Sequence, residues 1–404
     1  MATSSHDDDL QTESALIHAG RPDGKTPVWP VVNEPVYRIS TVLYDKAADM
    51  KTAAQRAYGD PYYGRRGTPT KHQFEAMVAA LEGAEHVMAV SCGLQAITVA
   101  MLAFLEQGDH IIVSDNVYDP TRKFADTFLK RMGIETTYIA PIVDEATFTA
   151  AFKPNTKLVM TEAPGSGTFE VPDLPMMTRI AHDHGALVII DNTWATGYFL
   201  DVFALGVDVS VVAATKYICG HADAMMGTVS TNDDGQWRKI FATSNQLGLS
   251  VSSDDCYLAA RGLRTLPMRL DQHEANALLL AQWLSEQPEV THVLHPAFPD
   301  CPGHEFWKRD FKGSSGLFSI CMDPDIDQDA INHLLDAATM FGMGFSWGGF
   351  ESLFIEMNNL DKSRTAAPFP ADGALLRVHA GLESADDLIS NLDQAFTSLR
   401  TFRG

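Results

Sequence analysis

The first half of the chain alternates short apolar segments with segments of helical periodicity. The apolar segments that we predict as buried strands are VMAV, HIIV, KLVMT, LVII and VSVV. This alternation predicts a largely parallel α/β sheet covered by helices on both faces. Ligands bind such sheets beyond the carboxyl ends of the strands. A binding site is predicted there, because four residues with useful chemistry follow strand ends: Tyr118, Glu162, Asp191 and Lys216.

The segments on either side of this sheet predict two further parts. Residues 1–67 contain many prolines and no clear periodicity, which indicates an extended arm. A helix is predicted from Thr68 to Glu82, ended by Gly83. After the sheet come long helices, one of which Pro267 could kink or break, and then short strands and helices typical of a small α/β unit. The predicted division is an arm at 1–67, a main domain at 68–262 and a smaller domain at 263–404.

A turn of small residues, Ser91-Cys92-Gly93, joins the first predicted strand to an apolar helix beginning at about Leu94. The first amides of a helix have no partner within it, so such a turn can hold a phosphate. The same arrangement also occurs in any strand–helix unit, so the turn alone leaves both interpretations open.

Lys216 stands in VVAATKYICGHADAMMG, directly after the predicted strand Val209–Val212. A buried ammonium group costs on the order of several kcal/mol unless it is paired or used. A buried amine can act as a nucleophile and form a Schiff base with a carbonyl cofactor. The alternative is a lysine that extends from the sheet edge into water.

Other charged or aromatic residues stand in segments where they indicate binding. Asp191 ends LVIID, where it would either face a cation such as a protonated pyridine nitrogen or cap a turn. Arg377 lies within LLRVH, where its planar fork would bind either a substrate carboxylate or an internal Asp or Glu. In the arm, Tyr63 and Arg65 of YYGRRG predict either a phosphate contact or an exposed basic loop.

The composition narrows the class of protein. An apolar share of 45% over 404 residues is that of an ordinary globular chain with more than one core. The net charge of −22 disfavours nucleic acid and anionic lipid as partners. No apolar run is long enough to span a membrane. The first residues, MATSSHDDDLQTES, lack the basic and apolar regions of a signal peptide, so a cytoplasmic location is expected.

Disulfide and metal chemistry have little support in the sequence. The five cysteines are odd in number, widely spaced and without a CxxC pair. His182 and His184 lie in a helical segment just before a glycine and lack a third ligand at a recognisable spacing. We therefore predict a helix surface there and no metal site.

Several motifs occur in a familiar order: YGRRG, SCG, DNT, AATKYICGHADAMMG, RGLRTL, SWGGFESL and LRVHAGLE. From about Asn33 onward the chain resembles the Cys/Met-metabolism, or trans-sulfuration, enzymes that depend on pyridoxal phosphate. Within that family it is most similar to the β-lyases that act on cystathionine. The resemblance implies a fold-type I pyridoxal-phosphate transferase architecture: a mostly parallel seven-stranded sheet domain, a smaller C-terminal α/β domain and an N-terminal arm.

The resemblance also implies pyridoxal 5'-phosphate as the cofactor. Lys216 would hold it and later shuttle a proton, Asp191 would keep its ring nitrogen protonated, and Tyr118 would stack on its ring. The residues implied to cradle the phosphate are Gly93, Leu94 and Thr215, with Tyr63 and Arg65 reaching the phosphate of a neighbouring subunit. A shared site of this kind implies a homo-oligomer, usually a tetramer built from two dimers.

On the substrate side, the resemblance assigns the carboxylate of an amino acid to Ser346, Trp347 and Arg377, and it implies Lys216, Tyr118 and Tyr63 as catalytic residues. The implied reaction is β-elimination of cystathionine to homocysteine, pyruvate and ammonia, a step of methionine biosynthesis. Relatives that act at Cγ typically carry Glu-Ser-Leu-Gly-Gly where this chain has Phe345-Ser346-Trp347-Gly348-Gly349.

Trp347 matches the β-lyases, but their usual residue at position 345 is a tyrosine, and Ala222 stands where a serine is more usual. The missing hydroxyl leads to the hypothesis that the enzyme accepts other β-substituted amino acids. A broad-specificity C–S lyase and a γ-acting relative are the alternatives, and racemisation of alanine is accessible to the same carbanion.

A hydrolase is the alternative from a different class. Ser91 lies on a strand-to-helix turn similar to a nucleophile elbow, and Asp191 and His221 follow in the right order. Against it, the first glycine of the elbow is Ala89, and no HGGG-type segment is present. A hydrolase would also leave Lys216 and Arg377 without a role.

Overall fold

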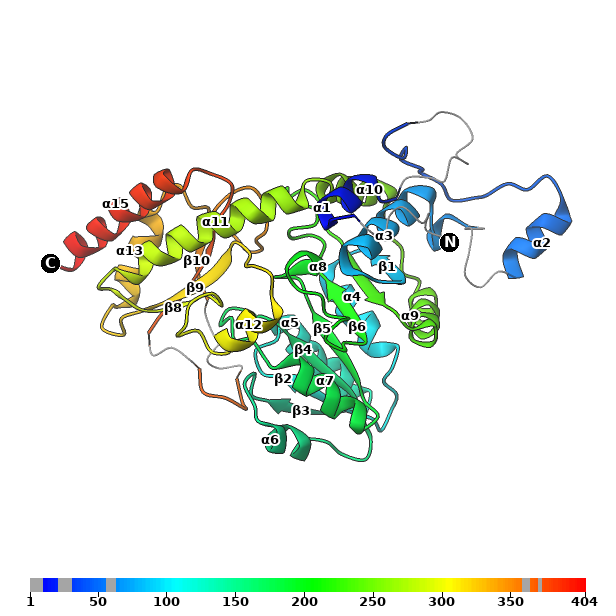
Figure 1. Cartoon of the computed structure of the whole chain (residues 1–404), viewed down its shortest axis with the longest axis horizontal. Coiled ribbons are helices and arrows are strands. Elements are labelled where there is room, and N and C mark those ends of the chain that lie inside the picture. The colour runs from blue at the N-terminus through cyan, green and yellow to red at the C-terminus, as the bar shows by residue number, and fades with distance from the viewer. Residues whose placement is uncertain (1–9, 21–30, 56–62, 358–363, 370–372) are drawn as a thin grey trace.

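A seven-stranded sheet, in the order β1-β7-β6-β5-β4-β2-β3, organises the first half of the chain (Figure 1). The pairs from β3 through β6 are parallel, and β7 is antiparallel to both of its neighbours, β6 and β1. This confirms the mostly parallel, seven-stranded sheet. The strands are β1 (His86–Val90), β2 (His110–Ser114), β3 (Glu135–Ile139), β4 (Thr156–Glu162), β5 (Leu187–Asp191), β6 (Val209–Val212) and β7 (Gly227–Thr231).

The computed structural model describes residues 10–20, 31–55, 63–357, 364–369 and 373–404. Within them, helices cover both faces of the sheet. Successive residues of a strand point to opposite sides, so a continuously apolar strand needs cover on both faces. On β2, Ile112 joins the apolar cluster beneath α3 and α7, whereas Ile111 and Val113 join the cluster beneath α4. The helices of this part are α3 (Pro69–Glu82), α4 (Gly93–Leu102), α5 (Asp119–Lys123), the π-helical turn η2 (Phe124–Leu129), α6 (Glu145–Ala150), α7 (Leu174–Asp183), α8 (Thr196–Phe199) and α9 (Asp234–Gln246).

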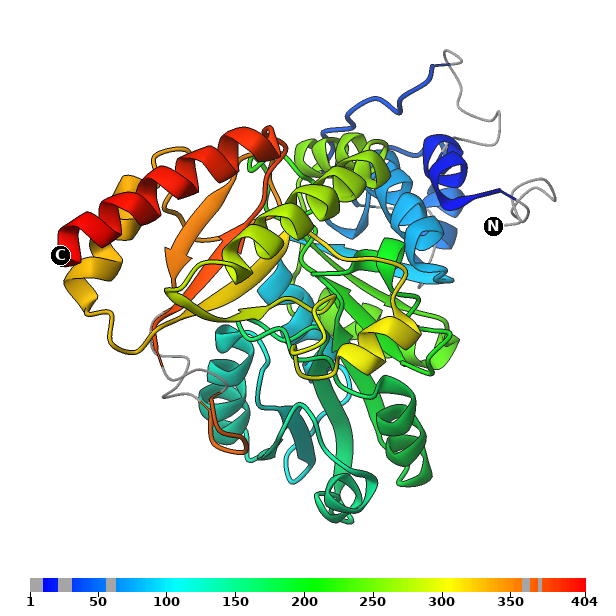
Figure 2. The same cartoon turned by 60° about the vertical axis from the view of Figure 1, so that its left-hand side comes forward.

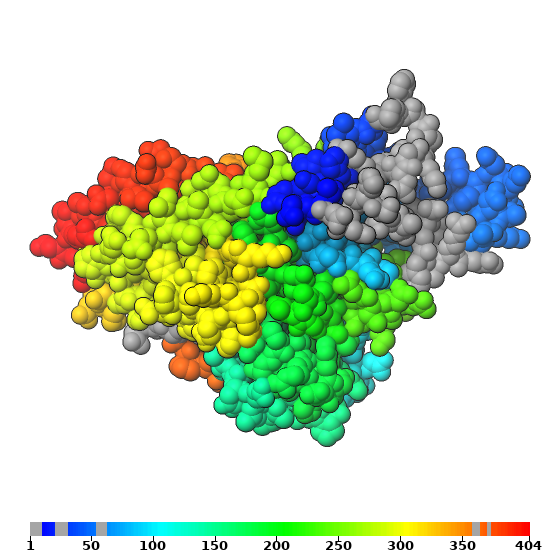
Figure 3. All heavy atoms as spheres, viewed as in Figure 1, coloured from blue at the N-terminus to red at the C-terminus, as the bar shows by residue number. Residues whose placement is uncertain are grey.

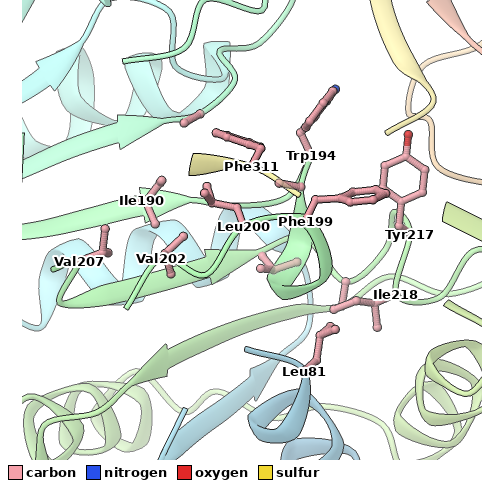
Figure 4. Packing of buried hydrophobic residues seen from close by; sticks show 14 of the residues in the cluster. Leu81, Ile190, Trp194, Phe199, Leu200, Val202, Val207, Tyr217, Ile218 and Phe311 are labelled. Carbon is pink, nitrogen blue, oxygen red and sulfur yellow. The ribbon is translucent and has the colours of Figure 1, made fainter. Parts of the chain in front are cut away.

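Figure 4 shows one of these cores from close by. Ile190 of β5 packs with Leu200, Val202 and Val207 from the segment that leads to β6, and all four are buried. Tyr217, the residue after Lys216, is fully buried in the same cluster. The loop that carries Lys216 is therefore anchored in the core by its neighbour.

The first long helix, α3, begins and ends as its sequence predicts. The hydroxyl of Thr68 accepts a hydrogen bond from the backbone N–H of Lys71, and Pro69 occupies the first turn, where no N–H is needed. Gly83 ends the helix with φ +64°, a left-handed conformation that favours glycine.

A four-stranded antiparallel sheet, in the order β10-β11-β9-β8, forms the second half of the chain (Figure 2). Pro267 does not kink a helix, because it lies in the first turn of α11, after α10 has ended. The domain boundary expected near residue 262 stays a prediction. The elements are α10 (Ser253–Leu263), α11 (Leu266–Ser285), β8 (Val290–Leu294), α12 (His304–Asp310), β9 (Leu317–Met322), α13 (Gln328–Ala337), β10 (Leu353–Glu356), β11 (Leu375–His379) and α15 (Ala385–Arg403).

The described part of the arm includes helices, which the prediction of an extended arm did not contain. It contains α1 (Thr12–His18), α2 (Ala47–Gln55) and the short 3-10 turn η1 (Gly64–Arg66). α1 forms because Leu16 is buried in the core beside α3, while Arg264 donates to the carbonyl of Ile17. The arm segments 1–9, 21–30 and 56–62 lie outside the described residues.

In the space-filling view, the C-terminal helix α15 lies at one end of the molecule and helix α2 of the arm at the other (Figure 3). None of the helices in the described residues is both long and apolar enough to cross a membrane. Four of the five cysteines are buried.

Candidate active site

Lys216 lies in the turn after β6 and faces a loop that is 130 residues away in sequence. Its Nζ donates to Oγ of Ser346 at 2.5 Å and lies 5.1 Å from the centre of the Trp347 ring. Gly348 allows this approach: a Cβ there would lie 2.9 Å from the carbonyl carbon of Lys216, and its φ is +85°. The two most specific motifs of the sequence therefore meet in space.

Burial lowers the pKa of Lys216 from 10.5 to about 8, with a further contribution from the charge of Arg377, while Asp191 opposes the shift. At pH 7 roughly a tenth of this amine is therefore neutral, which is the form that attacks a carbonyl. This environment favours the nucleophile over a lysine that is solvated at a strand end.

Asp191 ends β5 with only 7% of its surface exposed. Its Oδ1 accepts both the backbone N–H and the hydroxyl of Thr193, at 3.0 and 2.5 Å. Thr193 Oγ1 in turn accepts the N–H of Ala213, close to Lys216. Burial raises the pKa of Asp191, and the Thr193 bonds and the charge of Lys216 partly offset this.

Asp191 therefore closes a turn through one oxygen, and no described lysine, arginine or histidine forms an ion pair with it. Its other oxygen can meet a cation. The two interpretations of Asp191 are thus compatible. The sequence prediction missed Thr193, although the DNT triplet was the signal for it.

Arg377 lies in the middle of β11 and is 9% exposed. Its Nη2 donates to the backbone carbonyl of Ser346 at 2.9 Å. No described Asp or Glu pairs with this guanidinium, and burial lowers its pKa to about 10. An internal carboxylate partner is therefore not found in the described part of the chain, which favours a fork facing a ligand's carboxylate.

Tyr118 stands at the start of α5, at the edge where β2, β4 and β5 end, and 45% of its surface is exposed. Burial, and then the nearby charge of Asp191, raises the pKa of its phenol. Its backbone N–H donates to Oε2 of Glu162 at 2.6 Å. The phenol is therefore protonated near neutral pH and lies close to the acid that would face a ring nitrogen.

The turn before α4 provides an anion cradle. Cys92 stands at the cap position without a side-chain hydrogen bond to the helix, so the first amides, at Gly93 and Leu94, are left for a ligand. Gly93 lies against Ala213, where a Cβ would come within 2.5 Å of the alanine methyl. With Lys216 and Asp191 nearby, this set fits pyridoxal phosphate: anion cradle, amine and acid.

The hydroxyl of Thr215 is engaged within its own turn. Its hydroxyl donates to the carbonyl of Met226 at 3.1 Å and accepts the N–H of the same residue at 2.9 Å. These bonds fix the turn that carries Lys216. A contact between this hydroxyl and a phosphate stays a prediction.

Tyr63 and Arg65 contact other segments of their own chain. Tyr63 pairs with Thr41 in an isolated bridge, and Nη1 of Arg65 donates to Oδ1 of Asn245 in α9 at 3.4 Å. Their contribution to a neighbouring subunit is untested in a single chain and stays a prediction.

The hydrolase interpretation is wrong. Oγ of Ser91 donates to Oε1 of Gln95 at 2.9 Å, and Nδ1 of His221 bonds to the carbonyl of Cys219 at 2.7 Å. The serine and the histidine are thus engaged separately. At the candidate metal pair, His182 bonds to Asp208 and His184 to the carbonyl of Ile180, as expected of a helix end; no group of metal ligands occurs in the described residues.

Comparison with known proteins gives a consistent result. The sequence model of a family described as "Cys/Met metabolism PLP-dependent enzyme" matches residues 13–397. Cystathionine beta-lyase MetC of Escherichia coli is 39% identical over 97% of this chain and 99% of its own length. The L-alanine/L-glutamate racemase of Wolbachia pipientis is 36% identical over 96% and 98%. The crystal structure of cystathionine gamma-lyase from Lactobacillus plantarum, complexed with L-serine, superimposes with a TM-score of 0.86 at 28% identity, covering 97% of this chain and all of that one.

Proposed function

The chain belongs to the Cys/Met metabolism family of pyridoxal-phosphate-dependent enzymes, and we propose that it is a carbon–sulfur lyase that cleaves cystathionine at Cβ. Its cofactor is pyridoxal 5'-phosphate. The products would be homocysteine, pyruvate and ammonia. The observation that carries this proposal is the meeting of Lys216 Nζ with Ser346 Oγ at 2.5 Å, while Arg377 binds the carbonyl of the same serine.

The arrangement supports a different role for each of three residues of the chain. Bound pyridoxal phosphate supplies a carbonyl that condenses with the substrate amine and a ring that accepts the electron pair left at Cα. Arg377 would bind the substrate carboxylate and so direct Cα towards Lys216. Nζ of Lys216 would take the α-proton and donate it to the leaving sulfur as the C–S bond breaks. Asp191 would hold the positive charge of the ring nitrogen.

Two measurements test the proposal. The purified protein with pyridoxal phosphate should show a visible absorption band that borohydride bleaches. With cystathionine as substrate, pyruvate should appear together with homocysteine. Accumulation of α-ketobutyrate instead would indicate cleavage at Cγ and overturn the proposed position of cleavage.

The alternatives differ in the bond that breaks after the α-proton has left. A relative named as a racemase matches this chain over 98% of its own length, so conversion of L-alanine to D-alanine should be measured in the same preparation. We propose β-elimination over γ-elimination because Phe345 offers no acid beside Ser346. A racemase rate exceeding the rate of pyruvate formation would reverse our choice.

The substrate range is expected to depend on Phe345, whose side chain is 94% exposed beside Ser346. An aromatic ring without a hydroxyl cannot hydrogen-bond the distal polar groups of cystathionine, so we propose a broad preference for β-substituted amino acids. Phe345→Tyr is expected to raise the ratio of kcat/KM for cystathionine to kcat/KM for cystine or O-substituted serines. The expected increase is about 3- to 10-fold, the effect of one hydrogen bond. Phe345→Leu is the matched control and should not favour cystathionine. A wild-type enzyme that already strongly prefers cystathionine over these compounds would contradict the prediction.

Arg377→Lys is expected to raise KM for every amino-acid substrate about 100-fold, because an ammonium group cannot form the two parallel bonds of the guanidinium fork. The apparent affinity for pyridoxal phosphate should change little, since the hydrogen bond of Arg377 goes to the Ser346 loop. Michaelis constants for amino acids, compared with cofactor titrations, test both parts. An unchanged KM would mean that the substrate carboxylate binds elsewhere.

We also propose that the active unit is a homo-oligomer with shared sites, a tetramer of two dimers. The support is the family resemblance, which implies that Arg65 reaches the phosphate of a neighbouring subunit. Within its own chain, Arg65 bonds to Asn245 of α9. Mixing inactive Lys216→Ala chains with inactive Arg65→Ala chains should restore activity, because some sites would then combine two intact halves. Mixtures that stay inactive, although the two chains associate, would contradict a shared site.

A further inference from the structure

A second buried carboxyl, Glu162, lies directly beside Asp191. β4 and β5 are parallel neighbours, and Glu162 is paired in register with Asp191 at the last position of each strand. The two residues are 9% and 7% exposed. Within the described residues, Glu162 forms no ion pair with a lysine, arginine or histidine. The catalytic roles proposed above do not involve Glu162.

Glu162 connects three segments of the site. Its Oε2 accepts the backbone N–H of Tyr118 at 2.6 Å, across 44 residues of sequence, and its Oε1 lies 2.5 Å from the hydroxyl oxygen of Ser166. Tyr118 occupies the cap position of α5 and has no side-chain hydrogen bond to the helix. Glu162 therefore fixes the turn from which the Tyr118 ring projects.

Two adjacent buried carboxyls cannot both be ionised at low cost, because like charges repel strongly away from water. Burial raises the pKa of Glu162 well above its ordinary value, and the charge of Asp191 raises it further. Asp191 has the charge of Lys216 and two bonds from Thr193 to favour its ionised form. The other titratable group facing Glu162 is the phenol of Tyr118, which is not a cation. The proton of the pair therefore belongs on Glu162.

The contacts of Glu162 are those that a neutral carboxylic acid can make. Its carbonyl oxygen, Oε2, accepts from an N–H, which cannot reverse its direction. Its other oxygen faces a hydroxyl, which can either donate or accept. A protonated Oε1 can thus donate to Ser166 while Oε2 still holds Tyr118.

We propose that Glu162 is a positioning residue which, as a neutral acid, holds the Tyr118 turn at the sheet edge and leaves the negative charge on Asp191. The inference rests on the proposed function, because it assigns the Asp191 charge to the ring nitrogen of pyridoxal phosphate. Cofactor binding should therefore depend on the shape and hydrogen bonds of Glu162 and not on a negative charge at this residue.

The experiment compares Glu162→Gln with Glu162→Ala. Glutamine keeps a carbonyl for Tyr118 and an N–H for Ser166, whereas alanine leaves both without a partner. For each variant, the apo-protein is titrated with pyridoxal phosphate, and the pH midpoint of the visible band is measured. Glu162→Gln should stay within about 3-fold of the wild-type dissociation constant and about 0.3 pH unit of its midpoint. Glu162→Ala should weaken cofactor binding about 10- to 100-fold, since an unpaired buried N–H is costly.

Two controls keep this test decisive. Glu82 is another buried carboxyl that binds hydroxyls, those of Ser210 and Ser230, but it lies on α3; Glu82→Gln should leave the band and its midpoint unchanged. If Glu162→Ala does not fold, Ser166→Ala removes one partner of Glu162 and should weaken cofactor binding about 3- to 10-fold.

The outcomes separate this inference from the proposed function. A wild-type protein without a visible band would overturn the proposed function itself. A normal wild-type band with a midpoint displaced by a full unit or more in Glu162→Gln would show that Glu162 is an anion. Cofactor binding that is unchanged in both Glu162→Ala and Ser166→Ala would show that Glu162 does not position the site.

Discussion

Lys216→Ala is expected to lower kcat for β-elimination by about 10⁴-fold or more, the largest effect that we predict for any residue of this chain. One amine has two tasks in the proposed reaction, since it holds the cofactor and then moves the α-proton. No other described lysine is placed to replace it: Lys71, which is also buried, forms an ion pair with Glu75 at 2.9 Å. After treatment with borohydride, the cofactor should no longer be attached covalently to the protein.

The matched control is Ser346→Ala, which removes the hydroxyl bonded to Nζ at 2.5 Å but leaves the amine. We expect an effect of about 10-fold or less from this change, in line with the loss of one hydrogen bond. Addition of a small primary amine should partly restore proton transfer in Lys216→Ala, because the cavity left by the side chain faces the reacting carbon. Full activity in Lys216→Ala would assign the chemistry to a different group.

Much of the fold could be predicted because the apolar segments are short, almost uninterrupted by polar residues and bounded by polar residues at both ends. Each parallel strand in the interior of the main sheet is buried on both faces, so its sequence is almost continuously apolar. β3 and β7 were not predicted: ETTYI and GTVST contain several threonines, and only their position in the sheet identifies them as strands. α1 was missed for a similar reason, since seven residues are stabilised mainly by burial of Leu16 against α3.

The site could be predicted in part because strand ends are a general position for ligands. Lys216, Asp191 and Tyr118 were identified from that rule together with the resemblance to a family. What the sequence cannot provide is the partner of each group. The bonds from Arg377 to Ser346 and from Thr215 to Met226 depend on contacts between separate segments or on turn geometry. Glu162 was noticed at a strand end, but its register with Asp191 depends on how β4 and β5 pair in the sheet.

Asp191→Asn is expected to lower kcat about 10³-fold, because an amide cannot hold a positive charge on the ring nitrogen in a buried site. Leaving a buried charge without its partner costs about 3–5 kcal/mol, which corresponds to roughly 10²- to 10³-fold or more. The asparagine oxygen can still accept both bonds from Thr193, so the turn and the position of Ala213 should be kept. Thr193→Val removes only the hydroxyl bond and should cost about 10-fold.

The pH dependence distinguishes this electrostatic explanation from a loss of structure. Wild-type activity should fall as the pH decreases through the pKa of Asp191, because protonation removes the negative charge, and Asp191→Asn should lack this acidic limb. The pKa of Asp191 is raised on folding, so the ionised carboxylate destabilises the folded apo-protein at neutral pH. The Asp191→Asn variant should therefore leave the thermal stability of the apo-protein unchanged or raise it. If the variant is inactive and also unfolds at a lower temperature, the loss of activity is due to misfolding. If the variant is stable and keeps wild-type activity, Asp191 has no role in the chemistry.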